Sequence, residues 1–351
     1  MQDLMLQKTK RLLYIDALRG LAMLMVVFVH TEIFSFFNFN HTTTFMYILS
    51  AIHMPLFFFI SGVCIYKPNK IYDLERIKND FVRLIIPAIS IGLLYTYCVK
   101  GGDCMFFITN SMKAGYWFTI SLFEVLMIYY LIYNLTRNNN KIFMILLWGI
   151  AILLFLLKLP FKMFEGLDTI GNYLCLHQTF NYFFFFSLGI TSSKYKEKTI
   201  KLIEKSTFCT SILVLFAIIL VIMYGALPKF ADNSVMWRVL ENLGETTVSV
   251  LGVSLLYVIF FKSQRVFNSS NKLCSILIFI GNNTLAIYLI HYFFLPVLPQ
   301  WGKLLLSYPS FLVEVVLSLS VSLIVIGLSL LVNLIVKIVS PFISHSLLGG
   351  R

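Results

Sequence analysis

Residues 12–34 read LLYIDALRGLAMLMVVFVHTEIF, a largely apolar run that is long enough to cross a membrane as one helix. A helix needs about 20 such residues to span the hydrocarbon core of a bilayer. Basic residues precede the run, as they do in a signal peptide, but Asp16 and Arg19 interrupt it and no small-residue cleavage site follows. We therefore expect a retained first transmembrane helix.

Similar apolar runs recur along the whole chain. Hydrophobic residues make up 59% of the 351 residues and charged residues only 13%, whereas a soluble domain is about 25% charged. The sequence predicts an all-α protein, a polytopic transmembrane helical bundle in a lipid bilayer, with about ten spans in one integral-membrane domain over residues 1–351. The predicted spans are 12–34, 44–66, 81–99, 116–135, 142–158, 177–193, 207–227, 244–262, 275–297 and 310–338.

Two of these runs, 142–158 and 177–193, are short, so either could be tilted, merged with a neighbour or partly re-entrant. We detect no internal repeat and no soluble domain. The pattern leaves the oligomeric state open.

Lysine and arginine are unevenly divided between the two sides of the predicted membrane. The N-terminus and the loops on its side hold 20 of these residues and the opposite loops hold seven, while Arg19 lies inside a span. Basic loops remain on the cytoplasmic side of a membrane. We therefore predict that both termini are cytoplasmic and that the chain lies in the cell (inner) membrane. The net charge of +12 is explained by this bias, so we expect no nucleic-acid partner.

The six cysteines show neither a CxxC pair nor a zinc-site spacing, so we expect no metal. Cys98, Cys104 and Cys175 fall near the predicted outer face. A disulfide among them is possible in an oxidising compartment; alternatively, they are filler residues of membrane helices.

The first predicted span contains ionisable residues, which are costly inside a membrane and indicate function by default. On a helix, Arg19 and His30 differ by only about 20° in direction and about 16 Å in depth. Asp16 lies about 60° from Arg19, one turn below it, whereas Glu32 points away. One helix face thus carries Asp16, Arg19 and His30. Alternatively, Asp16 and Arg19 form an ion pair at the inner boundary and His30 makes a helix contact.

Other ionisable residues lie in later spans. His53 precedes Pro55 in the second span, at a depth comparable with that of His30, and histidine is suited to proton transfer near neutral pH. Alternatively, His53 bonds to the carbonyl that Pro55 leaves free. Glu124 is an intramembrane acid for which structural and functional interpretations are both open. His291 lies toward the outer end of its span and is interpreted as an interface histidine.

Arg76, Lys78 and Arg83 form a basic cluster before Pro87, where the third span begins. The planar guanidinium group binds phosphate with two parallel hydrogen bonds, so the cluster suits a phosphorylated ligand. The alternative interpretation is that these charges only set the topology.

Together, these residues resemble the acyltransferase-3 family of integral-membrane O-acyltransferases (acetyltransferases). The similarity starts at residues 14–20 and continues to His30, an arginine followed by ten residues and a histidine. Residues 53–62 are similar to the second-helix motif of that family. The segments 83–87, 116–118 and 281–291 follow in the order of the family.

The resemblance implies a membrane enzyme that transfers an acyl group, usually acetyl, from cytoplasmic acyl-CoA. Acetyl-CoA would be the donor substrate, and the acceptor would be a hydroxyl of a sugar, glycan or lipid-linked glycan at the outer face. It also implies that His30 is essential, with Arg19 as its motif partner. The candidate catalytic residues are His30, His53, Arg19, Asp16 and Glu124; the candidate donor-binding residues are Arg76, Arg83 and Arg19.

A proton-coupled transporter or exporter of a polar or anionic substrate is the main alternative, because intramembrane acids, arginines and histidines also line carriers. We find neither an inverted repeat nor a matching pair of broken helices in the sequence. A membrane scaffold without activity would leave the charged face of the first span without a purpose.

Overall fold

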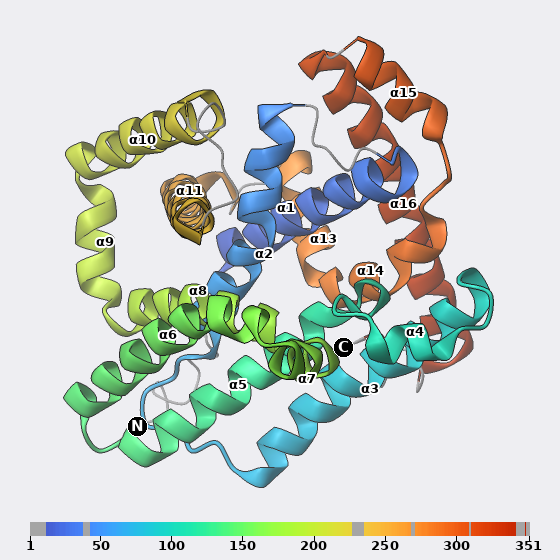
Figure 1. Cartoon of the computed structure of the whole chain (residues 1–351). Coiled ribbons are helices and arrows are strands. Elements are labelled where there is room, and N and C mark those ends of the chain that lie inside the picture. The colour runs from blue at the N-terminus through green and yellow to red at the C-terminus, as the bar shows by residue number, and fades with distance from the viewer. Residues whose placement is uncertain are drawn as a thin grey trace.

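The computed structural model describes residues 12–37, 43–226, 235–267, 271–308, 310–341 and 348. These residues form helices joined by short turns, without a β-strand among them, which confirms the predicted all-α class (Figure 1). Eight of the described helices are long and apolar enough to cross a membrane, and one bent pair raises the number of candidate spans to nine.

The candidate spans match the apolar runs of the sequence. They are α1 (Leu13–His30) with its π-helical extension η1 (Thr31–Ser35), α2 (Thr44–Ile65), α3 (Leu74–Val99), α5 (Trp117–Thr136), α6 (Asn140–Met163), α10 (Ser206–Val221) with η3 (Ile222–Ala226), α11 (Val235–Lys262) and α16 (Phe311–Val339). The bent pair consists of α13 (Lys272–Asn282) and α14 (Thr284–Ile290), which η5 (His291–Phe294) extends.

The remaining predicted run, 177–193, corresponds to α8 (Leu176–Lys194), which has the required length but carries too many polar residues to qualify by composition. The run at 142–158 was expected to be short, but α6 has 24 residues. The shorter connecting helices are α4 (Cys104–Thr109), η2 (Lys113–Gly115), α7 (Glu165–Leu174), α9 (Lys196–Glu204), α12 (Gln264–Phe267) and α15 (Pro299–Ser307).

Helix α1 lies near the centre of the bundle, where it contacts α2, α13 and α16 (Figure 1). Its contact with α13 is a direct approach of two backbones. A Cβ atom on Gly20 would overlap the carbonyl of Leu277, and one on Gly281 would overlap the carbonyl of Asp16. Small residues allow membrane helices to pack this closely. These two glycines therefore fix α1 against the helix that leads to the bend.

The bend between α13 and α14 measures 67° and falls at Asn283. A broken helix in a membrane protein is tolerated where it borders a cavity or is buried in protein. The bend turns α14 and η5 toward the C-terminal end of α1.

The outer disulfide considered above is not formed. All six cysteines are free, and Cys98 and Cys104 are exposed while Cys175 is buried. The cytoplasmic location of both termini remains a prediction.

Candidate active site

His30 is the last residue of α1, and its side chain forms a hydrogen bond with a second histidine. Its Nδ1 atom lies 2.8 Å from Nε2 of His291, the first residue of η5. The two imidazole planes are inclined by only 8°. On the other side of the His30 ring, the Tyr292 hydroxyl lies 3.2 Å from Nε2. His291, interpreted from the sequence as an interface residue, is thus the immediate partner of His30.

His291 is completely buried, and its second nitrogen faces the backbone. Nδ1 of His291 lies 3.0 Å from the carbonyl oxygen of Ile287 and 2.8 Å from that of Tyr288. Both ring nitrogens of this histidine therefore have partners inside the protein.

Aromatic rings surround the half-buried His30. The ring of Phe34 lies 5.5 Å from the imidazole centroid, and the Tyr292 ring lies 4.9 Å from it. Phe34 is 43% exposed, whereas Tyr292 is buried and contacts Tyr95. His30 is therefore bordered on one side by an exposed apolar ring and on the other by the protein core.

A polar cavity of about 880 Å³ opens at the end of the bundle that is predicted to be cytoplasmic. Its size lies within the range of about 300–1,000 Å³ that is common for ligand pockets. Five helices enclose it, α1, α2, α3, α5 and α16, and the bend between α13 and α14 completes the wall. The polar or reactive residues that line it include Asp16, Arg19, Ser61, Cys64, Arg83, Asn282, Asn283, Thr284, Asn333 and Lys337.

The cavity reaches almost to the histidine pair. Tyr288 lines the cavity and lies one helical turn before His291. The centroids of these two rings are 6.3 Å apart. The cavity wall and His30 are thus linked through Tyr288 and His291.

Asp16 and Arg19 form the ion pair that was considered as an alternative, with 3.7 Å between the carboxylate and the guanidinium. Both residues also line the cavity. The pair therefore contributes charge to the cavity wall. Glu32, expected to point away from this face, is buried against α16, where Ser318 donates a hydrogen bond to its carboxylate.

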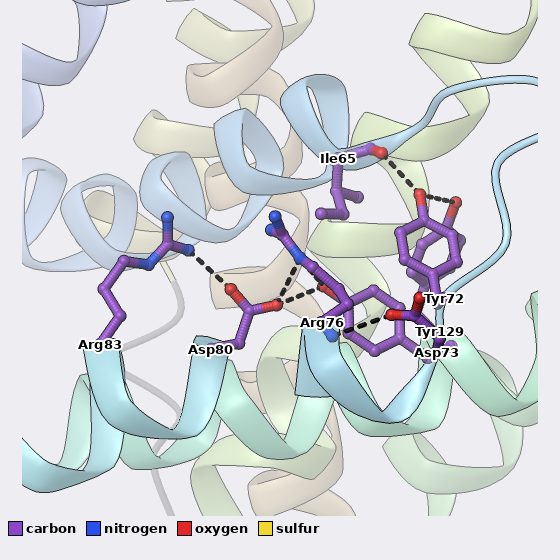
Figure 2. Close-up of polar contacts among 8 residues, drawn as sticks. Ile65, Tyr72, Asp73, Arg76, Asp80, Arg83 and Tyr129 are labelled. Carbon is purple, nitrogen blue, oxygen red and sulfur yellow. Dashed lines mark hydrogen bonds and ion pairs between the residues drawn. The ribbon is translucent and has the colours of Figure 1, made fainter. Parts of the chain in front are cut away.

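The basic cluster of α3 is organised by Asp80, a residue that is not among those predicted from the sequence (Figure 2). Arg76 donates from Nε to Oδ2 of Asp80 at 2.8 Å, and Arg83 lies 3.2 Å from Oδ1. The Tyr130 hydroxyl also donates to Oδ2, at 2.6 Å. Asp80 lies four residues after Arg76 and three before Arg83, and residues at these spacings share a helix face. This spacing was the sequence signal that could have identified Asp80 as a partner of both arginines.

The two predicted donor-binding arginines of this cluster are not equivalent. Arg83 lines the cavity, whereas Arg76 is not among the lining residues and donates to both Asp80 and Tyr130. Arg76 is also held at the start of α3, where its backbone N–H donates to the capping side chain of Asp73 (Figure 2).

His53 bonds to its own helix, but not in the way that its position beside Pro55 suggested. Its Nδ1 lies 2.8 Å from the carbonyl oxygen of Leu49. The carbonyl that Pro55 leaves free belongs to Ala51, and Ser249 of α11 donates to it at 2.6 Å. The interpretation of His53 as the partner of that carbonyl is therefore wrong.

Glu124 lies between α5 and α8, where the Thr179 hydroxyl donates to its carboxylate at 2.5 Å. It does not line the cavity. In the described part of the chain, no group of three histidines, cysteines or acids is arranged to hold a metal ion.

Comparison with protein families gives one result. The chain matches the Acyl_transf_3 family, described as an acyltransferase domain, over residues 12–336. No curated protein and no solved structure gives a match. Because the matched region covers nearly the whole chain and the described helices form a membrane bundle, this multi-pass membrane protein belongs to the acyltransferase-3 family of acyl-transferring enzymes.

Proposed function

We propose that this acyltransferase is an O-acetyltransferase that moves an acetyl group from cytoplasmic acetyl-CoA to a hydroxyl of a cell-envelope glycan or glycolipid. One observation carries the proposal: a cavity with basic walls ends at Tyr288, whose ring lies 6.3 Å from His291, the hydrogen-bonded partner of His30. A donor pocket and a proton acceptor are thus adjacent.

The donor side of the site suits an anionic, phosphorylated ligand. Arg19, Arg83 and Lys337 line the cavity, and charged hydrogen bonds to phosphate are about twice as strong as neutral ones. Asp80 holds one end of the Arg83 guanidinium, so this side chain is oriented before a ligand binds. Binding of the phosphates at the mouth would direct the thioester toward Tyr288.

His30 would act as the general base. Its Nε2 takes the proton of the acceptor hydroxyl while the acceptor oxygen bonds to the acetyl carbonyl carbon. The C–S bond then breaks, the electron pair stays on the CoA sulfur, and the proton passes from His30 to that thiolate. The acceptor would approach from the outer end of α1, along the exposed ring of Phe34.

The test uses the purified protein with radiolabelled acetyl-CoA and envelope glycans from the native host. We expect labelled ester on the glycan, and a His30→Ala variant that still binds acetyl-CoA but transfers about 10²–10⁴ times more slowly. His53→Ala should be less harmful, since His53 bonds to Leu49 within its own helix.

Near-normal transfer by His30→Ala, at equal protein level, would refute this role. A protein that binds no acetyl-CoA and consumes none would favour the transporter alternative, because a carrier does not break a thioester. Mass spectrometry of glycans from a deletion strain would then identify the acceptor.

A further inference from the structure

We propose that His291 is a positioning residue that locks His30 in the tautomer with its proton on Nδ1, so that Nε2 carries the lone pair that can accept a proton. The proposal rests on the proposed function for its catalytic consequence. The tautomer itself follows from the hydrogen bonds around the two rings.

The backbone decides where the proton of His291 lies. Nδ1 of His291 faces the carbonyl oxygens of Ile287 and Tyr288, at 3.0 and 2.8 Å. A carbonyl oxygen can only accept a hydrogen bond, and a neutral imidazole carries one N–H. The proton of His291 is therefore on Nδ1, since the other tautomer would set a lone pair against two oxygens.

The tautomer of His291 decides that of His30. With its proton on Nδ1, His291 presents a lone pair at Nε2, and this atom lies 2.8 Å from Nδ1 of His30. A hydrogen bond at this distance requires His30 to donate from Nδ1. Nε2 of His30 then carries a lone pair, to which the Tyr292 hydroxyl donates at 3.2 Å.

The arrangement has a catalytic consequence. The acceptor hydroxyl can take the place of the Tyr292 hydroxyl at Nε2 of His30 without a change of tautomer. When Nε2 takes the proton, Nδ1–H of the charged ring still points at the lone pair of His291, and a hydrogen bond from a charged donor is the stronger kind. Burial of His291 keeps water from competing for that bond.

Three substitutions of His291 distinguish control of the His30 tautomer from a general structural role. His291→Gln places an amide near the former Nε2 and can still accept from His30. His291→Asn keeps a polar atom near the former Nδ1, beside the carbonyls, but does not reach His30. His291→Leu offers no acceptor. We expect kcat to fall in the order wild type, Gln, then Asn and Leu together, with Leu slowed by about 10²-fold or more and acetyl-CoA affinity retained in all three.

Equal kcat values for the Gln and Leu variants, both well folded and both binding acetyl-CoA, would overturn the proposal. If the Leu variant does not fold, the comparison of Gln with Asn carries the same information, because only Gln can reach His30.

A second measurement does not depend on transferase activity. Nitrogen NMR of the protein with ¹⁵N-labelled histidine distinguishes protonated from unprotonated ring nitrogens, and a His30→Gln variant assigns the His30 signals among the six histidines. We expect the proton of His30 on Nδ1. A proton on Nε2 of His30 in the wild-type protein would overturn the proposed control of the tautomer by His291. A proton on Nδ1 of His30 in a protein that transfers no acetyl group would overturn only the proposed function.

Discussion

Oδ1 of Asp80 lies 3.2 Å from the guanidinium of Arg83, and these two side chains differ sharply in exposure, at 2% and 49%. The buried carboxylate thus anchors one end of an arginine whose other end is available to the cavity. Because Asp80 also accepts from Arg76 and Tyr130, its charge is shared among three donors.

Replacing Asp80 with Asn should therefore affect both stability and donor binding. An amide cannot accept from all three donors, and its own N–H₂ group would face one arginine. We expect the free energy of unfolding to fall by about 1–3 kcal/mol, the usual cost of leaving buried polar groups without partners. Thermal unfolding in detergent and an acetyl-CoA titration would measure the two effects; an unchanged melting temperature and affinity would contradict the anchoring role.

Arg83 and Arg76 should differ in their effect on acetyl-CoA binding. Arg83 lines the cavity and Arg76 does not. Because a hydrogen bond to a charged group contributes about 1.5–3 kcal/mol, Arg83→Gln should weaken binding about tenfold to a hundredfold. Arg76→Gln is the matched control on the same helix and should weaken binding less. Calorimetric titration of both variants tests this order, and the reverse order would move the donor site away from the cavity.

Lys158 should stabilise the packing of three helices. Its Nζ donates to Oδ1 of Asn181 in α8 and to Oδ1 of Asn242 in α11, both at 2.9 Å. It is the last residue of the predicted span 142–158 and lies within α6. Lys158→Met leaves both amide oxygens without this donor, so we expect the free energy of unfolding to fall by about 1–3 kcal/mol. Lys162→Met, an exposed residue on the same helix, should have little effect in the same unfolding measurement.

The sequence predicted the helical bundle because a segment that crosses lipid must form all its backbone hydrogen bonds internally, as a helix does. Each such helix is visible in the sequence as a long apolar run. It was less accurate at the ends of helices. The third span was predicted to begin at residue 81, but α3 begins at Leu74, since the Asp73 side chain caps the helix in its polar first turn. Apolar periodicity carries no information about a polar helix start.

The site was only partly predictable for a related reason. The shared face of Arg19 and His30 follows from the helical repeat alone. The contact between His30 and His291 joins positions 261 residues apart. It depends on the backbone contact of Gly20 and Gly281 and on the bend at Asn283, and neither packing nor a bend can be read from local spacing.

The native cysteines offer a test of the predicted topology. Cys104 is exposed in α4, on the side predicted to be outside. Cys64 is exposed at the end of α2 that is predicted to be cytoplasmic, and it lines the cavity. Cys175 is buried, and burial raises the pKa of its thiol to about 12. The reactive form is the thiolate, so Cys175 should remain unreactive at every pH well below that value.

In variants that keep one cysteine each, a membrane-impermeant maleimide should therefore label Cys104 in intact cells. It should label Cys64 only after the membrane is opened, and Cys175 in neither case. Acetyl-CoA, which has no free thiol, should slow the labelling of Cys64 in opened membranes because both would occupy the same cavity. Labelling of Cys64 but not Cys104 in intact cells would invert the orientation. Labelling of Cys64 at an unchanged rate with saturating acetyl-CoA would place the donor elsewhere.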